Sequence, residues 1–481
     1  MSESVGLPHS PDVPLCVDLD ESLVRTDTLA ESALALIRSS PVNGLRLLYW
    51  AWGGRARLKV RVAEACTLDA SLLPYNDEVL AFLRAERRAG RRLILTTGAA
   101  HSVAEGVARH LGLFDEVVAT TVDRNLTGRV KGEVLRERYG EGFDYLGNAA
   151  ADVPVWRHAR RALVVGAPMF LRRLSARGIT PARAFGGGKW SLRVVIRGLR
   201  VQQWAKNLLL FVPLLTSHKI FSDPPAVLAA GVAFLAFSLC ASGVYLVNDV
   251  LDLEHDRKHP TKRHRPLAAG LMSIRAAGLW TTGLLLAAGL AASQLPRAFA
   301  AILAIYFVAT FAYSMALKQR PVLDVLCLAG LYTLRIGAGA AAISVPVSRW
   351  LLAFSIFLFL SLALVKRISE LRLTRGAEGG RLHGRGYLGS DLDLLSGMGA
   401  ASAYTAVLTL ALYVTSPEVS RLYTRPDFLW AICPCFLYWL TRILLLARRG
   451  EITDDPVVFA IKDPASYAVL ALTVLFTVVA I

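Results

Sequence analysis

The sequence is poor in cysteine, and its six cysteines form no recognisable framework. They are scattered along 481 residues, mostly in apolar surroundings, with the spacing of neither a zinc site nor a disulfide scaffold. Cys433 and Cys435 flank a proline inside an apolar run, where we expect them to pack rather than carry redox chemistry. A cysteine-based metal or redox site is therefore not indicated.

The N-terminus lacks the basic region and the apolar core of a cleavable signal, so we expect the first part of the chain to stay in the cytoplasm. The sequence also lacks a basic motif interleaved with aromatic residues, although its formal charge is +17. Many arginines instead flank apolar runs, which is the pattern of cytoplasmic loops in membrane proteins. We expect no nucleic-acid partner.

Hydrophobic residues make up 54% of the chain, too many for a series of soluble domains, and they are unevenly spread. Short apolar runs alternate with charged stretches up to about Val165, whereas long apolar runs dominate from Asn207 onward. We expect a soluble domain at 1–165, a basic linker with an interfacial helix at 166–200, and a membrane domain at 201–481. A glycine triplet at 186–188 suits a hinge in that linker.

Five short apolar runs in the first part predict the strands of a doubly wound α/β sheet: 14–18, 92–97, 116–120, 143–146 and 162–165. Polar residues follow these runs, at the strand ends where such sheets place their sites. Asp18 and Asp20 leave the first strand two residues apart. One carboxylate of such a pair can attack phosphorus while the other protonates the leaving oxygen.

In order and spacing, residues 12–165 resemble the haloacid dehalogenase (HAD)-like phosphatases. The resemblance implies that Asp18 is the nucleophile and Asp20 the acid/base. It further implies that Thr97, or less favourably Thr96, and Lys131 bind phosphate. Mg²⁺ would be the cofactor, with ligands from Asp18, Asp20, Asn148 and Asp152.

Two residues depart from this family pattern. Glu21 replaces the glycine usual after the second aspartate, and Asn148 stands where the family normally has an acid. An active phosphatase and a degenerate, structural or regulatory domain both stay open. Residues 25–91 have helical patterning, and in this family an insertion there forms a small helical cap that selects substrate; a plain packing helix pair is the alternative.

Nine apolar segments predict nine membrane spans, the first of them short and broken by Pro213. They fall near 207–221, 226–247, 275–295, 297–316, 322–343, 349–365, 394–415, 428–447 and 465–481. With a cytoplasmic N-terminus, the loops expected inside carry most of the Lys and Arg residues. A multi-pass protein of the bacterial inner membrane is expected, with both sites on the cytoplasmic side.

Carboxylates cluster where the second span ends. Asp249, Asp252 and Asp256 would share one face of a helix extending that span, beside Asn248. Carboxylates at a membrane edge are a functional-site hypothesis by default. Their hard oxygens suit a magnesium-bound diphosphate, and the basic residues that follow can neutralise phosphate charge; these are Arg257, Lys262 and Arg265.

This NDxxDxxxD pattern in a nine-span background resembles the UbiA superfamily of intramembrane prenyltransferases over residues 193–481. QWAKN at 203–207, YSMALK with Asp324, TLRIGAG at 333–339 and KRISELR at 366–372 resemble one branch of it, the decaprenyl-phosphate phosphoribosyltransferases. Leu328 stands where the common second DxxxD motif needs an acid. Lys206, Lys318, Arg335 and Lys366 are candidates for phosphate binding, with membrane-flanking roles as the alternative; Tyr313 is a ligand or an interfacial aromatic.

The two resemblances imply a bifunctional enzyme. The membrane domain would use Mg²⁺ to transfer 5-phosphoribose from phosphoribosyl diphosphate to polyprenyl phosphate, and the HAD-like domain would remove the 5-phosphate, towards decaprenylphosphoryl arabinose. The alternative is prenyl transfer from a diphosphate to an aromatic or other acceptor, beside an inert or regulatory HAD-like domain. The sequence leaves the lipid length and the oligomeric state open.

Overall fold

The computed structural model describes residues 12–40, 42–186, 191–374, 385–452 and 456–481. It divides the chain into two compact units. The first consists of the residues up to Arg200 and Tyr245–Thr282, and the second of Val201–Val244 and Gly283–Ile481. Each unit is described separately below.

The first unit contains a parallel sheet of six strands in the order β3-β2-β1-β4-β5-β6. The five predicted strands are confirmed, and β1 lies at the centre. The strands are β1 Leu15–Val17, β2 Leu93–Ala100, β3 Glu116–Thr120, β4 Asp144–Gly147, β5 Arg161–Gly166 and β6 Pro181–Gly186.

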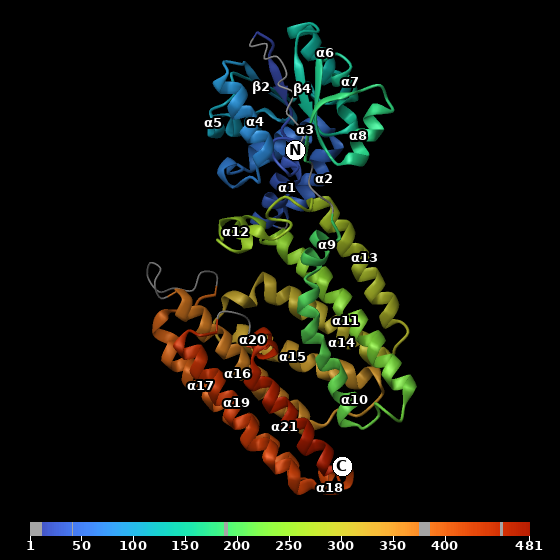
Figure 1. Ribbon diagram of the computed structural model, residues 1–481, viewed down its shortest axis with the longest axis vertical. Coiled ribbons are helices and arrows are strands. Elements are labelled where there is room, and N and C mark those ends of the chain that lie inside the picture. The colour runs from blue at the N-terminus through green and yellow to red at the C-terminus, as the bar shows by residue number, and fades with distance from the viewer. Residues whose placement is uncertain (1–11, 41, 187–190, 375–384, 453–455) are drawn as a thin grey trace, which may run out of the picture. The chain divides into compact units, whose positions relative to one another are not determined.

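Side chains of successive residues in these strands point to opposite faces, and both faces are buried. Leu15 and Val17 belong to one core, whereas Cys16 belongs to the other. Helices α4 (Asp77–Arg88) and α5 (His101–Leu111) cover the first face. The second face is covered by α6 (Gly128–Tyr139), α7 (Val153–Trp156) and α8 (Pro168–Ser175) (Figure 1).

The sheet extends further than the sequence suggested. Helix α8 and strand β6 fall inside the expected linker, but β6 pairs with β5 along its length, so the expected domain boundary at 165 is too early. Residues 187–190, which hold most of the expected hinge, lie outside the described residues. The following helix α9, Leu192–Leu199, is capped by Ser191, whose hydroxyl accepts a hydrogen bond from the N–H of Val194.

The insertion between β1 and β2 is helical, as expected. It contains α1 (Thr28–Ser39), α2 (Asn43–Trp52), α3 (Arg55–Ala65) and the short 3₁₀ helix η1 (Ala70–Leu72). Helices α1, α2 and α3 pack against one another (Figure 1). The first unit also includes α12 (Leu253–Lys258), the 3₁₀ helix η4 (Lys262–His264), and the adjoining ends of α11 (Pro224–Leu251) and α13 (Ile274–Ala292).

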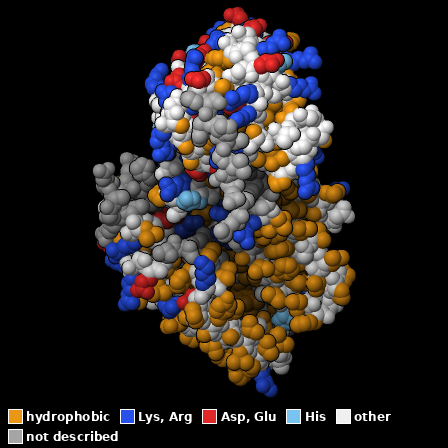
Figure 2. Space-filling model, turned by 45° about the horizontal axis from the view of Figure 1, so that its top comes forward, with side chains coloured by type: hydrophobic (Ala, Val, Ile, Leu, Met, Phe, Trp, Pro, Cys, Tyr) orange, Lys and Arg blue, Asp and Glu red, His pale blue; other side chains and the backbone are white. Residues whose placement is uncertain are grey.

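The second unit is built of helices. Its further helices are η3 (Val201–Phe211), α10 (Val212–Thr216), α14 (Arg297–Met315), η5 (Leu317–Gln319), α15 (Leu323–Ala342), α16 (Arg349–Thr374), η7 (Gly389–Asp391), α17 (Leu392–Val414), α18 (Pro417–Leu422), η8 (Pro426–Ala431), α19 (Ile432–Arg449), α20 (Pro456–Lys462) and α21 (Pro464–Ala480). The largest core lies among α15, α16, α17 and α19. Figure 2 shows a broad hydrophobic surface over the membrane half, whereas charged side chains gather on the sheet domain.

Among the described residues, seven helices are long and apolar enough to cross a membrane, and they coincide with the second to eighth predicted spans. The expected count of nine is not matched. The first predicted span is a 3₁₀ helix followed by the five-residue α10, with Pro213 near the start of α10. The ninth is α21, an apolar helix of 17 residues. The protein is thus a multi-pass membrane protein with an α/β domain.

Candidate active sites

Asp18 lies directly after the central strand β1, where its backbone N–H donates to Leu146 O of the neighbouring strand. The carboxylate is buried, and Lys131 Nζ donates to its Oδ1 at 2.7 Å. Lys131 comes from α6 and is itself only 3% exposed. The structure thus brings together Asp18 and Lys131, the residues predicted as nucleophile and phosphate ligand, and an ammonium group in this place could bind an arriving anion.

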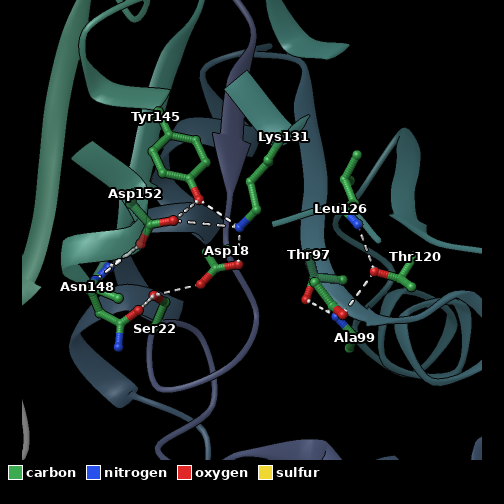
Figure 3. A network of polar contacts seen from close by, with 12 residues as sticks. Asp18, Ser22, Thr97, Ala99, Thr120, Leu126, Lys131, Tyr145, Asn148 and Asp152 are labelled. Atoms are coloured by element: carbon green, nitrogen blue, oxygen red, sulfur yellow. Dashed lines mark hydrogen bonds and ion pairs between the residues drawn. The ribbon is translucent and has the colours of Figure 1, made fainter. Parts of the chain in front are cut away.

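A buried network surrounds this pair (Figure 3). Lys131 Nζ also donates to Tyr145 Oη at 2.9 Å, and Tyr145 Oη donates to Asp152 Oδ1 at 2.9 Å. The other oxygen of Asp152 accepts the backbone N–H groups of Asn148 and Ala149, at 3.2 and 3.0 Å. Both oxygens of Asp152 are therefore engaged in closing this loop, so its contacts do not favour the metal-ligand role expected for it.

Gly147 precedes this loop and has a steric role. A Cβ at this position would lie 2.7 Å from Asp152 Oδ2 and 2.7 Å from the ring of Tyr145. Any larger residue would push the carboxylate away from the two backbone N–H groups.

Asn148 faces the nucleophile through Ser22. The Ser22 hydroxyl lies 3.1 Å from Asn148 Oδ1 and 3.5 Å from Asp18 Oδ2. Two hard oxygens, one from a carboxylate and one from an amide, thus converge on a single hydroxyl (Figure 3). Such oxygens are the ligands that Mg²⁺ prefers, so the donor set here fits the expected ion although Asn148 lacks the charge of an acid.

Burial shifts the titration of both catalytic candidates. It raises the pKa of Asp18 to about 6, even though Lys131 pulls the value down, and it raises the pKa of Asp20 to about 7, with further upward shifts from Asp27 and Asp18. Asp20 Oδ1 accepts the N–H of Thr28 at 2.8 Å. A carboxyl that keeps its proton near neutral pH is suited to protonate a leaving oxygen.

Thr97 is placed differently from the prediction. Its Oγ1 accepts the N–H of Ala99 at 3.0 Å, both Thr96 and Thr97 are fully buried, and neither lines the cavity in front of Asp18. Figure 3 shows Thr97 apart from the group around Lys131. The predicted phosphate contact is therefore not supported by the position of this hydroxyl.

The cavity in front of Asp18 has a volume of about 670 Å³ and is lined by residues of the insertion, which fits the expected cap. Lys59, from α3, was missed by the sequence reasoning. Its Nζ donates to Gly98 O at 2.6 Å and to Asn125 Oδ1 at 3.1 Å, which fixes a cation at the cavity wall. Nothing in the sequence distinguishes Lys59 from the neighbouring cations Arg55, Arg57 and Arg61.

Glu21 lies at a position whose backbone conformation favours glycine. Its φ is +56°, in the left-handed region, where a side chain costs energy and glycine does not. Its carboxylate accepts from Asn148 Nδ2 at 3.4 Å. The two departures from the family pattern are thus in contact.

A second cluster lies at the end of α11. Asp249 and Asp256 are both buried, and Arg265 Nη1 joins them, at 3.1 Å from Asp249 Oδ1 and 2.6 Å from Asp256 Oδ2. Arg200 forms a second ion pair with Asp249. Asn248 Oδ1 is buried and has no hydrogen-bond partner among the described residues. A buried oxygen without a partner can accept a hard cation, which is the kind of ligand expected for Asn248.

The prediction that one continuous helix carries all three aspartates is wrong. Helix α11 ends at Leu251, and Asp252, with φ −94° and ψ 10°, precedes the first residue of α12. Asp249 and Asp256 therefore lie on two helices, although i→i−4 hydrogen bonds cross the break, from Asp252 N–H to Asn248 O and from Asp256 N–H to Asp252 O. In the described parts of the chain, no three His, Cys, Asp or Glu side chains are grouped as ready metal ligands. Arginines, rather than a third acid, complete this cluster.

Arg257 does not join it. Arg257 donates from Nη1 and Nη2 to the two carboxylate oxygens of Glu31, at 2.7 and 2.5 Å, and from Nε to Ala268 O at 3.1 Å. With these three nitrogens engaged, the expectation that Arg257 neutralises phosphate is not supported. Lys262 is exposed in η4.

In the second unit, Asp324 is fully buried at the start of α15. It accepts from Arg367 Nε at 2.6 Å and from Tyr387 Oη at 2.5 Å. Tyr313 Oη accepts from Arg367 Nη2 at 3.1 Å and from Arg385 Nη1 at 2.5 Å. Tyr313 and Asp324 were predicted together, but Arg367, which links them, was missed in favour of its neighbour Lys366.

Arg335 is also buried, where it serves packing. It donates to Asn207 Oδ1, Leu331 O and Tyr306 Oη, at 2.9, 2.6 and 3.1 Å, and stacks near aromatic rings. These contacts support neither phosphate binding nor the membrane-flanking role that was its alternative. Lys206 lies over the ring of Tyr332, and Lys318 and Lys366 are partly buried in η5 and α16.

Comparison with known proteins identifies both parts. The model of the UbiA prenyltransferase family matches residues 209–462, which is more than half of the chain. The chain belongs to the UbiA prenyltransferase family. The model of the haloacid dehalogenase-like hydrolases matches residues 16–157, so this UbiA-family protein carries an N-terminal HAD-like domain around Asp18.

Three relatives of this UbiA-family protein differ in how much of it they match. The uncharacterized protein y4nM of Sinorhizobium fredii is 37% identical over 96% of this chain and 89% of its own. The nodulation protein NoeC of Azorhizobium caulinodans is 38% identical over 56% of this chain and 86% of its own. The decaprenyl-phosphate phosphoribosyltransferase of Mycolicibacterium smegmatis is 40% identical over 37% of this chain and 57% of its own.

Proposed function

We propose that this protein is a bifunctional, Mg²⁺-dependent enzyme of the bacterial inner membrane. It transfers 5-phosphoribose from phosphoribosyl diphosphate to polyprenyl phosphate, such as decaprenyl phosphate, and its HAD-like domain then removes the 5-phosphate. The similarity to decaprenyl-phosphate phosphoribosyltransferases carries the first step. The buried Asp18–Lys131 pair beside Asp20 supports the second. Both sites face the cytoplasm in this proposal.

In the transfer step, a phosphate oxygen of the lipid attacks C1 of the ribose. The bond from C1 to the diphosphate oxygen breaks, and the diphosphate leaves with the electron pair. The attacking phosphate is already anionic, so the protein's task is to position it and to stabilise the leaving charge. When bound, Mg²⁺ would supply positive charge to the diphosphate; Asn248, Asp249 and Asp256 are its proposed ligands, and Asp252 is a further candidate.

The candidate phosphate-binding cations divide into two groups. Arg200 and Arg265 already bind the carboxylates and are close to where the diphosphate would lie. Lys206, Lys262, Lys318 and Lys366 remain candidates for the lipid phosphate or the ribose 5-phosphate. The Tyr313–Asp324–Arg367 network holds the ends of α14, α15 and α16 together, and we assign it to positioning.

In the hydrolysis step, Asp18 attacks phosphorus while Lys131 binds a phosphoryl oxygen. The bond from phosphorus to the ribose O5 breaks, and Asp20 gives its proton to that oxygen. Asp20, now ionised, accepts a proton from the water that cleaves the aspartyl phosphate, which restores Asp18 and releases inorganic phosphate. Asn148 and Asp18 are the proposed magnesium ligands.

The test uses the purified full-length protein with Mg²⁺, phosphoribosyl diphosphate labelled in the ribose, and decaprenyl phosphate. We expect lipid-extractable label with the wild type and none with Asp249→Ala. With Asp18→Asn, the labelled lipid should accumulate in its 5-phosphorylated form and free phosphate should disappear. Asp223→Asn, which removes a half-exposed carboxylate directly before the other end of α11, is the matched control and should behave as the wild type.

Other outcomes would reject the proposal. Label that appears only from a prenyl diphosphate, on an aromatic acceptor, would favour prenyl transfer, which the family's name also describes. An unchanged product with Asp18→Asn would make the HAD-like domain structural or regulatory.

A further inference from the structure

Helix α2 of the insertion exposes an apolar face. Leu45, Leu48, Tyr49 and Trp52 recur every three or four residues and lie on one side of the helix. Their exposed fractions are 68, 70, 68 and 92%, and Val42, just before the helix, is 65% exposed. Single exposed apolar residues are ordinary, but a contiguous stripe of large ones marks an interaction surface.

The rest of α2 is held by its neighbours. Asn43 is its buried residue, and Asn43 Nδ2 donates to Leu36 O of α1 at 3.0 Å. Helices α1 and α3 pack against α2. A helix of ten residues is only marginally stable by itself in water. Burial of its apolar face would add stabilising free energy that is absent while the face contacts water.

Helix α1, on which α2 rests, is fastened to the ends of two membrane helices. Glu31 pairs with Arg257 in α12, which begins two residues after α11 ends. Arg38 contacts His255 Nδ1 at 2.5 Å. Asp27 pairs with Arg275, the second residue of α13. Both α11 and α13 are long and apolar enough to span a membrane, so the insertion is anchored where the chain leaves the bilayer.

The charge of residues 42–63 favours an anionic surface as the partner of α2. Residues 42–63 contain no Asp or Glu, and they contain five cations: Arg46, Arg55, Arg57, Lys59 and Arg61. Tryptophan and tyrosine on the apolar face with arginine beside them is the composition of helices that lie in the interface of an anionic membrane. Basic residues at such a surface add attraction to anionic lipid headgroups.

We propose that α2 lies in the headgroup region of the membrane that the spanning helices cross, with Trp52 and Leu48 reaching the acyl boundary. Arg55 and Arg57 of α3 then meet lipid phosphates, whereas Arg61 is paired with Glu64 of the same helix. This contact goes beyond the proposed function and does not depend on it. Its consequence is that the cavity in front of Asp18, which α3 lines, opens beside the lipid surface, where a phosphate carried on a lipid would be found.

The test is quenching of Trp52 by brominated lipids. Full-length protein is reconstituted into vesicles of phosphatidylcholine and phosphatidylglycerol, with or without bromine on the acyl chains. The difference in tryptophan emission between the wild type and Trp52→Phe is the signal of Trp52. We expect bromine to quench about half or more of it, because an interfacial helix places its apolar side chains at the acyl boundary. Vesicles without phosphatidylglycerol should show less quenching.

A matched control places a tryptophan elsewhere on the same unit. Met169 in α8 is 65% exposed, so Met169→Trp in the Trp52→Phe background should be fluorescent and unquenched. Equal quenching at both positions, or none at Trp52, would overturn the proposal. If Trp52 is unquenched and its emission is blue-shifted only at high protein-to-lipid ratio, a second copy covers α2 instead. In size-exclusion chromatography, Trp52→Phe should elute at the same volume as the wild type, which shows that the variant is folded.

Discussion

The carboxylate of Glu31 and the guanidinium of Arg257, 226 residues apart in the sequence, form a two-point ion pair whose side chains are 5 and 8% exposed. Glu31 belongs to the HAD-like insertion, and Arg257 follows Asp256 of the membrane-edge cluster. A buried pair of this kind is costly to break from one side, because the remaining charge stays desolvated.

Glu31→Gln should therefore destabilise the protein by about 3–5 kcal/mol and lower its melting temperature by about 5 °C or more. It should also reduce transferase activity, since α12 carries Asp256. Thermal unfolding and lipid labelling measure the two effects. Glu254→Gln, which breaks an exposed pair with Lys258, should change the melting temperature little. A similar loss in both variants would contradict a special role for Glu31.

Lys59 is predicted to bind the phosphomonoester. Lys59→Met should raise KM for phosphate ester hydrolysis about tenfold, the equivalent of about 1.4 kcal/mol of lost charge-assisted binding, with a smaller change in kcat. The matched control is Arg109→Met, which removes an exposed cation from α5 that does not line the cavity. An unchanged KM would assign Lys59 to packing alone.

The same residue predicts a pH dependence. Burial lowers the pKa of Lys59 below its ordinary value, although Asp20 and Asp27 oppose the shift. Because the ammonium binds anions only while protonated, KM should rise as pH increases through this lowered pKa. Lys59→Arg should keep KM flat over the same range, since a guanidinium stays charged. Parallel KM profiles for the two proteins would contradict the assignment.

Asn148→Asp should increase the affinity of the HAD-like site for Mg²⁺. An additional carboxylate charge strengthens binding of hard cations, and Ser22 can still donate to the new side chain. We expect the Mg²⁺ concentration for half-maximal phosphate release to fall about tenfold. A titration of Asp18-dependent hydrolysis measures it. An unchanged midpoint would show that position 148 does not contact the ion.

Two glycines of α15 should respond oppositely to alanine. A Cβ on Gly339 would collide with the backbone of Leu210 in η3, whereas one on Gly337 meets nothing within 4 Å. Gly339→Ala should lower the melting temperature because backbone, unlike a side chain, cannot move aside. Gly337→Ala should be neutral or stabilising by up to about 1 kcal/mol, the helix propensity difference. Equal melting temperatures would refute the close packing.

Strong local patterns allowed the sequence to predict the central strands and Asp18, because a buried parallel strand is a continuous apolar run that ends in a polar residue. Strand β6, PARAFG, has no such run. It is an edge strand with exposed residues, and its pairing with β5 decides its structure. Likewise, the seven long apolar helices could be predicted from their length and hydropathy. The helix type of residues 201–216 could not, because it depends on packing against α15.

Site residues that depend on tertiary contacts were harder to predict. Lys366 and Arg367 are adjacent cations, and only the position of Asp324 shows that Arg367 is the buried one. Spacing alone suggested a continuous helix through Asp252, because no proline or glycine near Asp252 indicates that the helix ends there. Arg257 looked like any other basic residue until Glu31 was seen to bind it.

The chain does not complete the first unit in the order in which it is made. That unit uses residues up to Arg200 and then Tyr245–Thr282, with part of the second unit between them. At ordinary rates of synthesis, the 226 residues between Glu31 and Arg257 take on the order of tens of seconds. During that interval the sheet can form, but α1 has no counter-ion. The HAD-like domain therefore reaches its final state only after α11 has been synthesised and the loop that follows it has emerged.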